Sequence, residues 1–270
     1  MITLVPIGGL ANRMRAVVAA FRASEKISQP LRIVWQDTDN CSARFDQLFE
    51  PLEGTNFNIV AGSFRDTPAT HNNLWLPSLL RLAQYDRQLE DYVPKERNSL
   101  LKLAEGDKRL YISTCHALCD YDPADVSHCF RPLPRLAEQV EETARLFAPL
   151  TLGVHIRRTD NKQAILNSPL QAFRQKTADF LKQPGSKVFL CTDDNSVKTY
   201  FRQLFGDRLV TRRACLKRNS LHGMQDAVID LWALARTSKV LGSYYSSFSD
   251  TATELGGQPL ETIFASSDKP

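Results

Sequence analysis

The sequence has no run of eighteen apolar residues, the length that an α-helix needs to cross a bilayer, so we expect no membrane span. Its net charge is only +4 over 270 residues, which argues against a nucleic-acid partner. The first ten residues, MITLVPIGGL, have no basic leader followed by an apolar region and a small-residue cleavage site. These absences predict a cytoplasmic protein.

The sequence also has no clear metal motif. Cys115, His116, Cys119, His128 and Cys129 cluster in the chain, but their gaps do not match the usual zinc patterns, and free thiols are the expected reading.

Two aspartate pairs, Asp37/Asp39 and Asp120/Asp122, have the spacing that can hold a divalent cation. Chance alone produces about one such pair in a chain with this aspartate content. We therefore expect no metal and no cofactor.

Short apolar runs alternate with helical patterns along the whole chain, which predicts an α/β fold with parallel sheets covered by helices. The predicted strands are 2–7, 31–35, 57–60, 110–113, 150–156, 187–191, 208–210 and 239–242. The predicted helices are 11–27, 43–49, 133–147, 170–181, 197–205, 225–237 and 249–255, with an irregular helical region over 74–105. The series restarts near Pro149, which predicts two Rossmann-like lobes, 1–148 and 149–270.

Polar side chains gather where the predicted strand 150–156 ends. His155, Arg157, Arg158 and Asp160 follow an apolar run, and ligands of open parallel sheets bind beyond the carboxyl ends of strands. Because strand residues alternate between two faces, Arg157 shares a face with His155, and Arg158 faces the other way. One arginine can then hold a phosphate while the other braces the loop. The alternative is a surface turn in which either arginine pairs with Asp160.

Three further stretches end a strand in the same way. PIGGLANRMR, residues 6–15, puts Gly9 and Asn12 at a strand-to-helix turn, where free amides favour an anion, although a simple tight turn explains it equally well. FLCTDDN, residues 189–195, offers Asp193 and Asp194, one of which can cap the next helix. In residues 224–252, a serine-rich turn follows the predicted strand 239–242; it forms either a phosphate cradle or a helix cap.

The four stretches in this order resemble the fucosyltransferase superfamily, which includes α1,2-, α1,6-, nodulation and protein O-fucosyltransferases. GGLANRMR, HIRRTD, CTDD and DLWALARTSKVLGSYYSSFSDTA carry the resemblance, which runs from about residue 5 to residue 255. HIRRTD is the most specific of them. The resemblance implies a GT-B fold with two facing Rossmann-like lobes, the first on the acceptor side and the second binding the nucleotide sugar.

The resemblance also implies the reaction and its residues. It implies inverting, metal-independent transfer of L-fucose from GDP-fucose to a glycan hydroxyl. The expected setting is bacterial glycan biosynthesis, and a peripheral association with glycan-assembly machinery stays open. Arg157 matches the arginine that binds the diphosphate, and Asp230 the carboxylate that reads guanine. Asp160 and Asp193, by location alone, are candidates for the catalytic base. The remaining expected donor-site residues are Gly9, Asn12, His155, Arg158, Asp193, Ser246, Ser247 and Phe248.

Two alternatives keep the same fold. One is transfer from another GDP-sugar, and the other is a non-catalytic protein that binds a nucleotide sugar without turning it over. Arginine suits transfer from GDP-fucose and from another GDP-sugar alike. It stays charged, and it donates two parallel hydrogen bonds to a phosphate whose negative charge grows as the sugar leaves.

Overall fold

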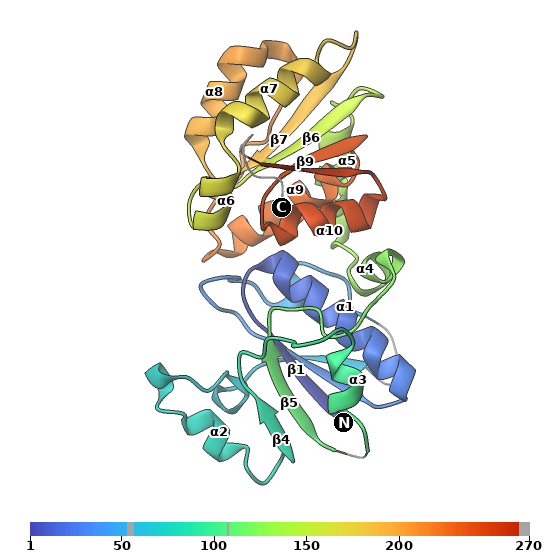
Figure 1. Cartoon of the computed structure of the whole chain (residues 1–270), viewed down its shortest axis with the longest axis vertical. Helices are drawn as coiled ribbons and strands as arrows, with labels where there is room; N and C mark the ends of the chain where they lie inside the picture. The colour runs from blue at the N-terminus through green and yellow to red at the C-terminus, as the bar shows by residue number, and fades with distance from the viewer. Residues whose placement is uncertain (53–56, 107, 265–270) are drawn as a thin grey trace. The chain divides into compact units, whose positions relative to one another are not determined.

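The computed structural model describes residues 1–52, 57–106 and 108–264. The chain divides into two compact units (Figure 1). The first consists of Met1–Leu133 with Lys217–Met224, and the second of Pro134–Leu216 with Gln225–Pro270. No helix within the described ranges is both long enough and apolar enough to cross a membrane. The functional division into an acceptor-side lobe, 1–148, and a donor lobe, 149–270, stays a prediction.

The first unit is built on a five-stranded sheet in the order β3-β2-β1-β5-β4, with every neighbouring pair parallel. All five residues of the central strand β1 are buried. The strands are β1 (Ile2–Pro6), β2 (Leu31–Trp35), β3 (Phe57–Ala61), β4 (Arg87–Leu89) and β5 (Leu110–Thr114). The helices are α1 (Leu10–Ile27), α2 (Leu76–Leu80), α3 (Ser99–Leu103) and α4 (Pro123–Cys129).

The second unit has a second parallel sheet, in the order β10-β9-β6-β7-β8, again with every neighbouring pair parallel. Its central strand β6 is buried at all six positions, as the apolar run in the sequence requires. The strands are β6 (Thr151–Ile156), β7 (Lys187–Thr192), β8 (Leu209–Val210), β9 (Lys239–Ser243) and β10 (Leu260–Ile263). The helices are α5 (Pro134–Ala144), α6 (Lys162–Asn167), α7 (Leu170–Phe180), α8 (Asn195–Phe205), α9 (Leu221–Leu234) and α10 (Ser247–Gly256). The start of α9, up to Met224, belongs to the first unit.

The predicted α/β class with parallel sheets is confirmed, but several elements differ from the predicted ones. The edge strands β4 and β10 were not expected, because three or four residues carry too little periodicity to be recognised. The predicted helix 43–49 is only a 3₁₀ turn, Phe45–Gln47. The irregular region 74–105 contains two five-residue helices and β4 in place of longer helices.

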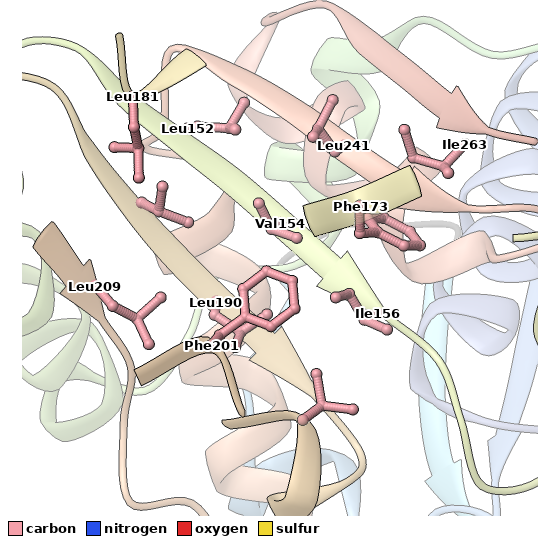
Figure 2. Packing of buried hydrophobic residues seen from close by; sticks show 12 residues of the cluster. Leu152, Val154, Ile156, Phe173, Leu181, Leu190, Phe201, Leu209, Leu241 and Ile263 are labelled. Carbon is pink, nitrogen blue, oxygen red and sulfur yellow. The ribbon is translucent and has the colours of Figure 1, made fainter. Parts of the chain in front are cut away.

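One face of the second sheet packs on a cluster of aliphatic and aromatic side chains (Figure 2). Val154 of β6 and Leu190 of β7 are paired in register, and both belong to this cluster. Phe173 from α7 and Phe201 from α8 cover them and are fully buried. This core holds β6 and β7 rigidly, so the residues that follow them start from fixed positions.

Replacing Phe173 by alanine should destabilise the second unit by about 3–5 kcal/mol, because the change removes a fully buried ring and leaves a cavity. Urea denaturation of the whole chain measures the loss. Leu166→Ala in α6 is the control, because Leu166 is 75% exposed and should cost under about 0.5 kcal/mol. Equal effects of the two changes would contradict the assignment of Phe173 to the core.

Candidate functional site

The carboxyl ends of β6, β7 and β9 bring most of the predicted residues to one edge of the second sheet. His155 of β6 is in register with Cys191 of β7 and with Gly242 of β9. The residues that come directly after these strands therefore emerge side by side. They are Arg157 after β6, Asp193 after β7 and the turn 244–246 after β9.

Asp193 anchors the loop that follows β6. Its Oδ1 accepts a hydrogen bond from the backbone N–H of Arg158 at 2.7 Å. Its Oδ2 accepts from the backbone N–H of Thr159 at 3.3 Å and from the Thr159 hydroxyl at 2.7 Å. The same oxygen lies 3.3 Å from Nε of Arg157. The carboxylate is thus engaged with the loop itself, while its neighbour Asp194 caps α8 by accepting from the Ser196 N–H at 2.7 Å.

Arg157 is held by groups on both sides of its strand. Its backbone N–H donates to the Ser243 hydroxyl at the end of β9, at 3.0 Å. Its Nη2 donates to Oδ1 of Asp160 at 2.6 Å, while Nε faces Asp193. The side chain is 19% exposed, and Nη1 has no hydrogen-bond partner among the described residues. A guanidinium fixed in this way keeps donors available for an anion.

Arg158 points into the protein. Its Nη2 donates to the backbone carbonyl of Ser168 at 2.5 Å, and Nη1 to that of Ile165 at 3.4 Å. Its Nε is buried without a partner in the described part of the chain. Burial lowers the pKa of Arg158, and the charges of Asp193 and Asp194 oppose that shift. Arg158 therefore braces the α6–α7 junction, whereas Arg157 pairs with Asp160, as in the surface turn that the sequence left open as an alternative. The role of Arg157 in binding a ligand stays a prediction.

His155 joins β6 to the turn after β9. Its ring stacks on Phe248 at 4.7 Å between centroids and 30° between planes. Its Nδ1 lies 2.9 Å from the Ser249 hydroxyl and 3.4 Å from that of Ser246. Burial, and next the charge of Arg157, lower the pKa of His155 to about 3. The ring is therefore neutral at physiological pH and fixes the start of α10 as a hydrogen-bonded, stacked group.

The turn before α10 carries the predicted serines. Ser246 is the residue before the helix and Ser247 is its first residue. Tyr245 has a positive φ of 54°, which places its side chain outward at 72% exposure. The first amides of this ten-residue helix lie at the same sheet edge as Arg157 and favour negative charge there. Ser249, the last residue of the serine-rich stretch, has its hydroxyl 2.9 Å from Nδ1 of His155.

Asp230 lies on α9 and is paired with an arginine that the sequence did not single out. Nη1 of Arg212 donates to Oδ1 of Asp230 at 2.7 Å, and Nη2 of Arg212 donates to Oδ1 of Asp226 at 2.7 Å. Burial raises the pKa of Asp230, and the ion pair with Arg212 acts in the opposite direction. The sequence indicates only part of this cluster, through the spacing of Asp226 and Asp230, which lie one helical turn apart.

Gly9 and Asn12 lie in the first unit, in the turn between β1 and α1. Gly8 takes a positive φ of 80°, and Gly9 precedes the helix in an extended conformation. Oδ1 of Asn12 accepts from Nη2 of Arg15 at 2.6 Å. Arg13 is buried, and its Nε donates to the carbonyl of Gly8 at 2.9 Å, which locks the turn.

No group of three or more His, Cys, Asp or Glu side chains within the described ranges is arranged to hold a metal ion. Asp37 instead accepts a hydrogen bond from the Ser42 hydroxyl at 2.8 Å. All six cysteines are free thiols.

No protein-family model matches the chain, and no curated protein matches it by sequence. Solved structures do. A structure of the α1,6-fucosyltransferase NodZ soaked with GDP-fucose aligns with a TM-score of 0.66 at 19% identity, over 94% of this chain and 92% of that one. NodZ has been solved from Bradyrhizobium.

A mutant of Arabidopsis thaliana FUT1 in complex with GDP aligns with a TM-score of 0.65 at 11% identity, over 100% of this chain and 71% of that one. POFUT1 in complex with GDP aligns at 0.56 and 10% identity, over 97% and 98% of the two chains. The chain has the fold of the fucosyltransferases. The resemblance seen in the four motifs is thereby confirmed at the level of the fold.

The buried His155 should make stability depend on pH in a defined direction. Its pKa is about 3 in the folded chain and about 6.5 in an unfolded one, so the unfolded chain binds more protons between these values. The free energy of unfolding should therefore fall as the pH drops below about 6.5, by up to about 1.4 kcal/mol per pH unit from this group. His155→Asn should remove that part of the slope, measured by urea denaturation from pH 5 to 7. His71→Asn, at an exposed position of the first unit, is the control, and equal slopes in both variants would contradict the prediction.

Proposed function

We propose that the chain is a glycosyltransferase that moves L-fucose from GDP-fucose to a hydroxyl of a glycan. The fold supports a fucosyltransferase, and the similar structures of NodZ, FUT1 and POFUT1 contain GDP-fucose or GDP. The observation that carries the proposal within this chain is the position of Arg157. Its guanidinium lies at the carboxyl end of the central strand and is fixed by two carboxylates, at the sheet edge where α10 also begins.

Arg157 supplies what the reaction demands. When the bond between fucose and the β-phosphate breaks, negative charge grows on the departing GDP. The free Nη1 of Arg157 and the first amides of α10 are donors that can receive that charge without reorganising. Asp160 is half exposed, so the diphosphate can take its place on Nη2, while Asp193 stays bound to the loop backbone.

The proposed transfer is a single displacement with inversion. The glycan hydroxyl attacks the anomeric carbon from the side opposite to GDP, the sugar–phosphate bond breaks, and the hydroxyl proton passes to a base. Asp160 stays a candidate for that base by location. Its carboxylate accepts a hydrogen bond from Arg157 at 2.6 Å, a contact that the diphosphate would have to displace before Asp160 could take the proton.

The remaining parts of the proposal follow from the same comparison. We place the protein in the cytoplasm and in bacterial glycan biosynthesis, with GDP-fucose and a glycan as its partners and no metal or other cofactor. The similarity to NodZ supports this setting.

Arg157→Ala should abolish fucosyl transfer while the chain stays folded. Removing one preorganised donor to a developing charge costs about 10²–10³ in rate, and Arg157 offers more than one. The assay follows release of GDP from GDP-fucose in the presence of a glycan mixture, and also without acceptor as slow hydrolysis. Arg202→Ala, at an exposed position on α8, is the matched control and should be fully active.

Near-normal transfer by Arg157→Ala would refute the assignment. The same assay with GDP-mannose and UDP-sugars decides the donor: turnover of GDP-mannose in preference to GDP-fucose would replace fucose by another sugar. Donor binding without any turnover or hydrolysis would show a non-catalytic binding protein.

Treatment with EDTA should leave transfer unchanged, because the proposed mechanism neutralises the leaving group with Arg157 and backbone amides. Rates before and after chelation, and after adding back Mn²⁺, measure this. Loss of activity that Mn²⁺ restores would contradict metal independence and direct attention to Asp37 and Asp39. Asp37→Ala would then have to lose the Mn²⁺ response.

A further inference from the structure

We propose that Arg212 is a positioning residue for base recognition, which holds Asp230 so that one carboxylate oxygen is presented to the guanine of a GDP donor. The inference rests on the proposed function, since it takes GDP as the ligand. Arg212 does not need to touch the base. It acts through Asp230.

Arg212 bridges two aspartates that lie one turn apart on α9. It donates from Nη2 to Asp226 and from Nη1 to Asp230, both at 2.7 Å, and Nη1 also approaches the backbone carbonyl of Asp226 at 3.3 Å. The side chains of Arg212 and Asp230 are each 14% exposed, and that of Asp226 is 7% exposed. A planar fork between two carboxylates has little freedom to rotate, so it fixes both.

The two aspartates differ in what their second oxygen does. Oδ2 of Asp226 accepts from the backbone N–H of Cys215 at 2.7 Å, so Asp226 ties the segment after β8 to α9. Oδ2 of Asp230 has no hydrogen-bond partner among the described residues, and it is not one of their buried polar atoms that lack a partner. This oxygen is therefore the one that is left to accept a hydrogen bond from a ligand, on a side chain that is 14% exposed.

The ion pair with Arg212, at 2.7 Å, favours the ionised form of Asp230, in which Oδ2 accepts hydrogen bonds. Burial raises the pKa of Asp230, and Asp226 acts in the same direction. Arg212 and, less strongly, Lys198 from α8 oppose that shift. The Cys191 thiol of β7 donates to the backbone carbonyl of Asp230, at 3.8 Å. Without Arg212, only Lys198 would oppose the rise in the pKa of Asp230 that burial and Asp226 cause.

An ionised carboxylate selects a base edge that donates. Guanine presents N1–H and an amino group on one edge, whereas adenine presents an unprotonated N1 at the corresponding place. The fixed, charged Oδ2 of Asp230 therefore favours guanine. A protonated Asp230 would instead donate a hydrogen bond, which the unprotonated N1 of adenine can accept, so ADP could bind as well.

The test measures the Kd of GDP and of ADP by titration calorimetry from pH 5.5 to 8, for wild type and for Arg212→Met. Wild type should prefer GDP with little change over this range. Arg212→Met should weaken GDP binding about tenfold or more, as expected for lost hydrogen bonds to a charged group. Its GDP affinity should rise with pH, because Asp230 then ionises only at higher pH, and its preference over ADP should be smallest at pH 5.5.

Two further variants separate positioning from folding. Arg213→Met changes the adjacent, exposed arginine and should behave as wild type. Arg212→Lys keeps a positive charge but cannot bridge both carboxylates, so it should keep the flat pH profile with a smaller loss of affinity.

The outcomes distinguish this inference from the proposed function. Wild type that binds neither GDP nor ADP, or that binds them equally, would overturn both. Wild type that prefers GDP, together with an Arg212→Met variant that keeps both the preference and the flat profile, would overturn the role of Arg212 alone. If Arg212→Met does not fold, Arg212→Lys decides instead: a variant that binds GDP as tightly as wild type would refute positioning by Arg212.

Discussion

The site depends on the contact between Asp193 and the loop that follows β6. Two neighbouring parallel strands end at the same level, and the carboxylate after one binds three donors from the loop after the other. That contact fixes the backbone at residues 158–159. Because the backbone is fixed there, Arg157 and Arg158 leave the strand in opposite directions, one toward solvent and ligand and the other into the α6–α7 junction.

A second contact extends the same edge to β9. The neutral ring of His155 holds the Ser249 hydroxyl and stacks on Phe248, and the Arg157 N–H binds Ser243. The start of α10 is therefore placed relative to Arg157 by buried groups that carry no charge. A charged imidazole at this point would repel the guanidinium, and burial prevents it.

The sequence predicts these features where local rules decide them. Alternation along a strand separates Arg157 from Arg158, and Asp194 before a helical pattern indicates a cap. It could not predict that Arg212 pairs with Asp230, because the two residues are eighteen positions apart in the chain and only the fold brings them together. The edge strands β4 and β10 were not predicted for a related reason, because these short segments become strands only by pairing with longer neighbours.

The local charges determine how an anion can bind. Arg157 lies between two carboxylates, so its charge is compensated. Under the proposed function, Nη1 can donate to the diphosphate directly, whereas Nη2 can do so only when the diphosphate replaces Asp160. Asp193 is retained by the loop backbone, whereas Asp160 is 52% exposed and can be solvated once released. Binding at Nη2 is then an exchange of a carboxylate for a phosphate. Such an exchange favours a ligand with more charge than one carboxylate, which a diphosphate has, and it becomes more favourable as the leaving group gains charge.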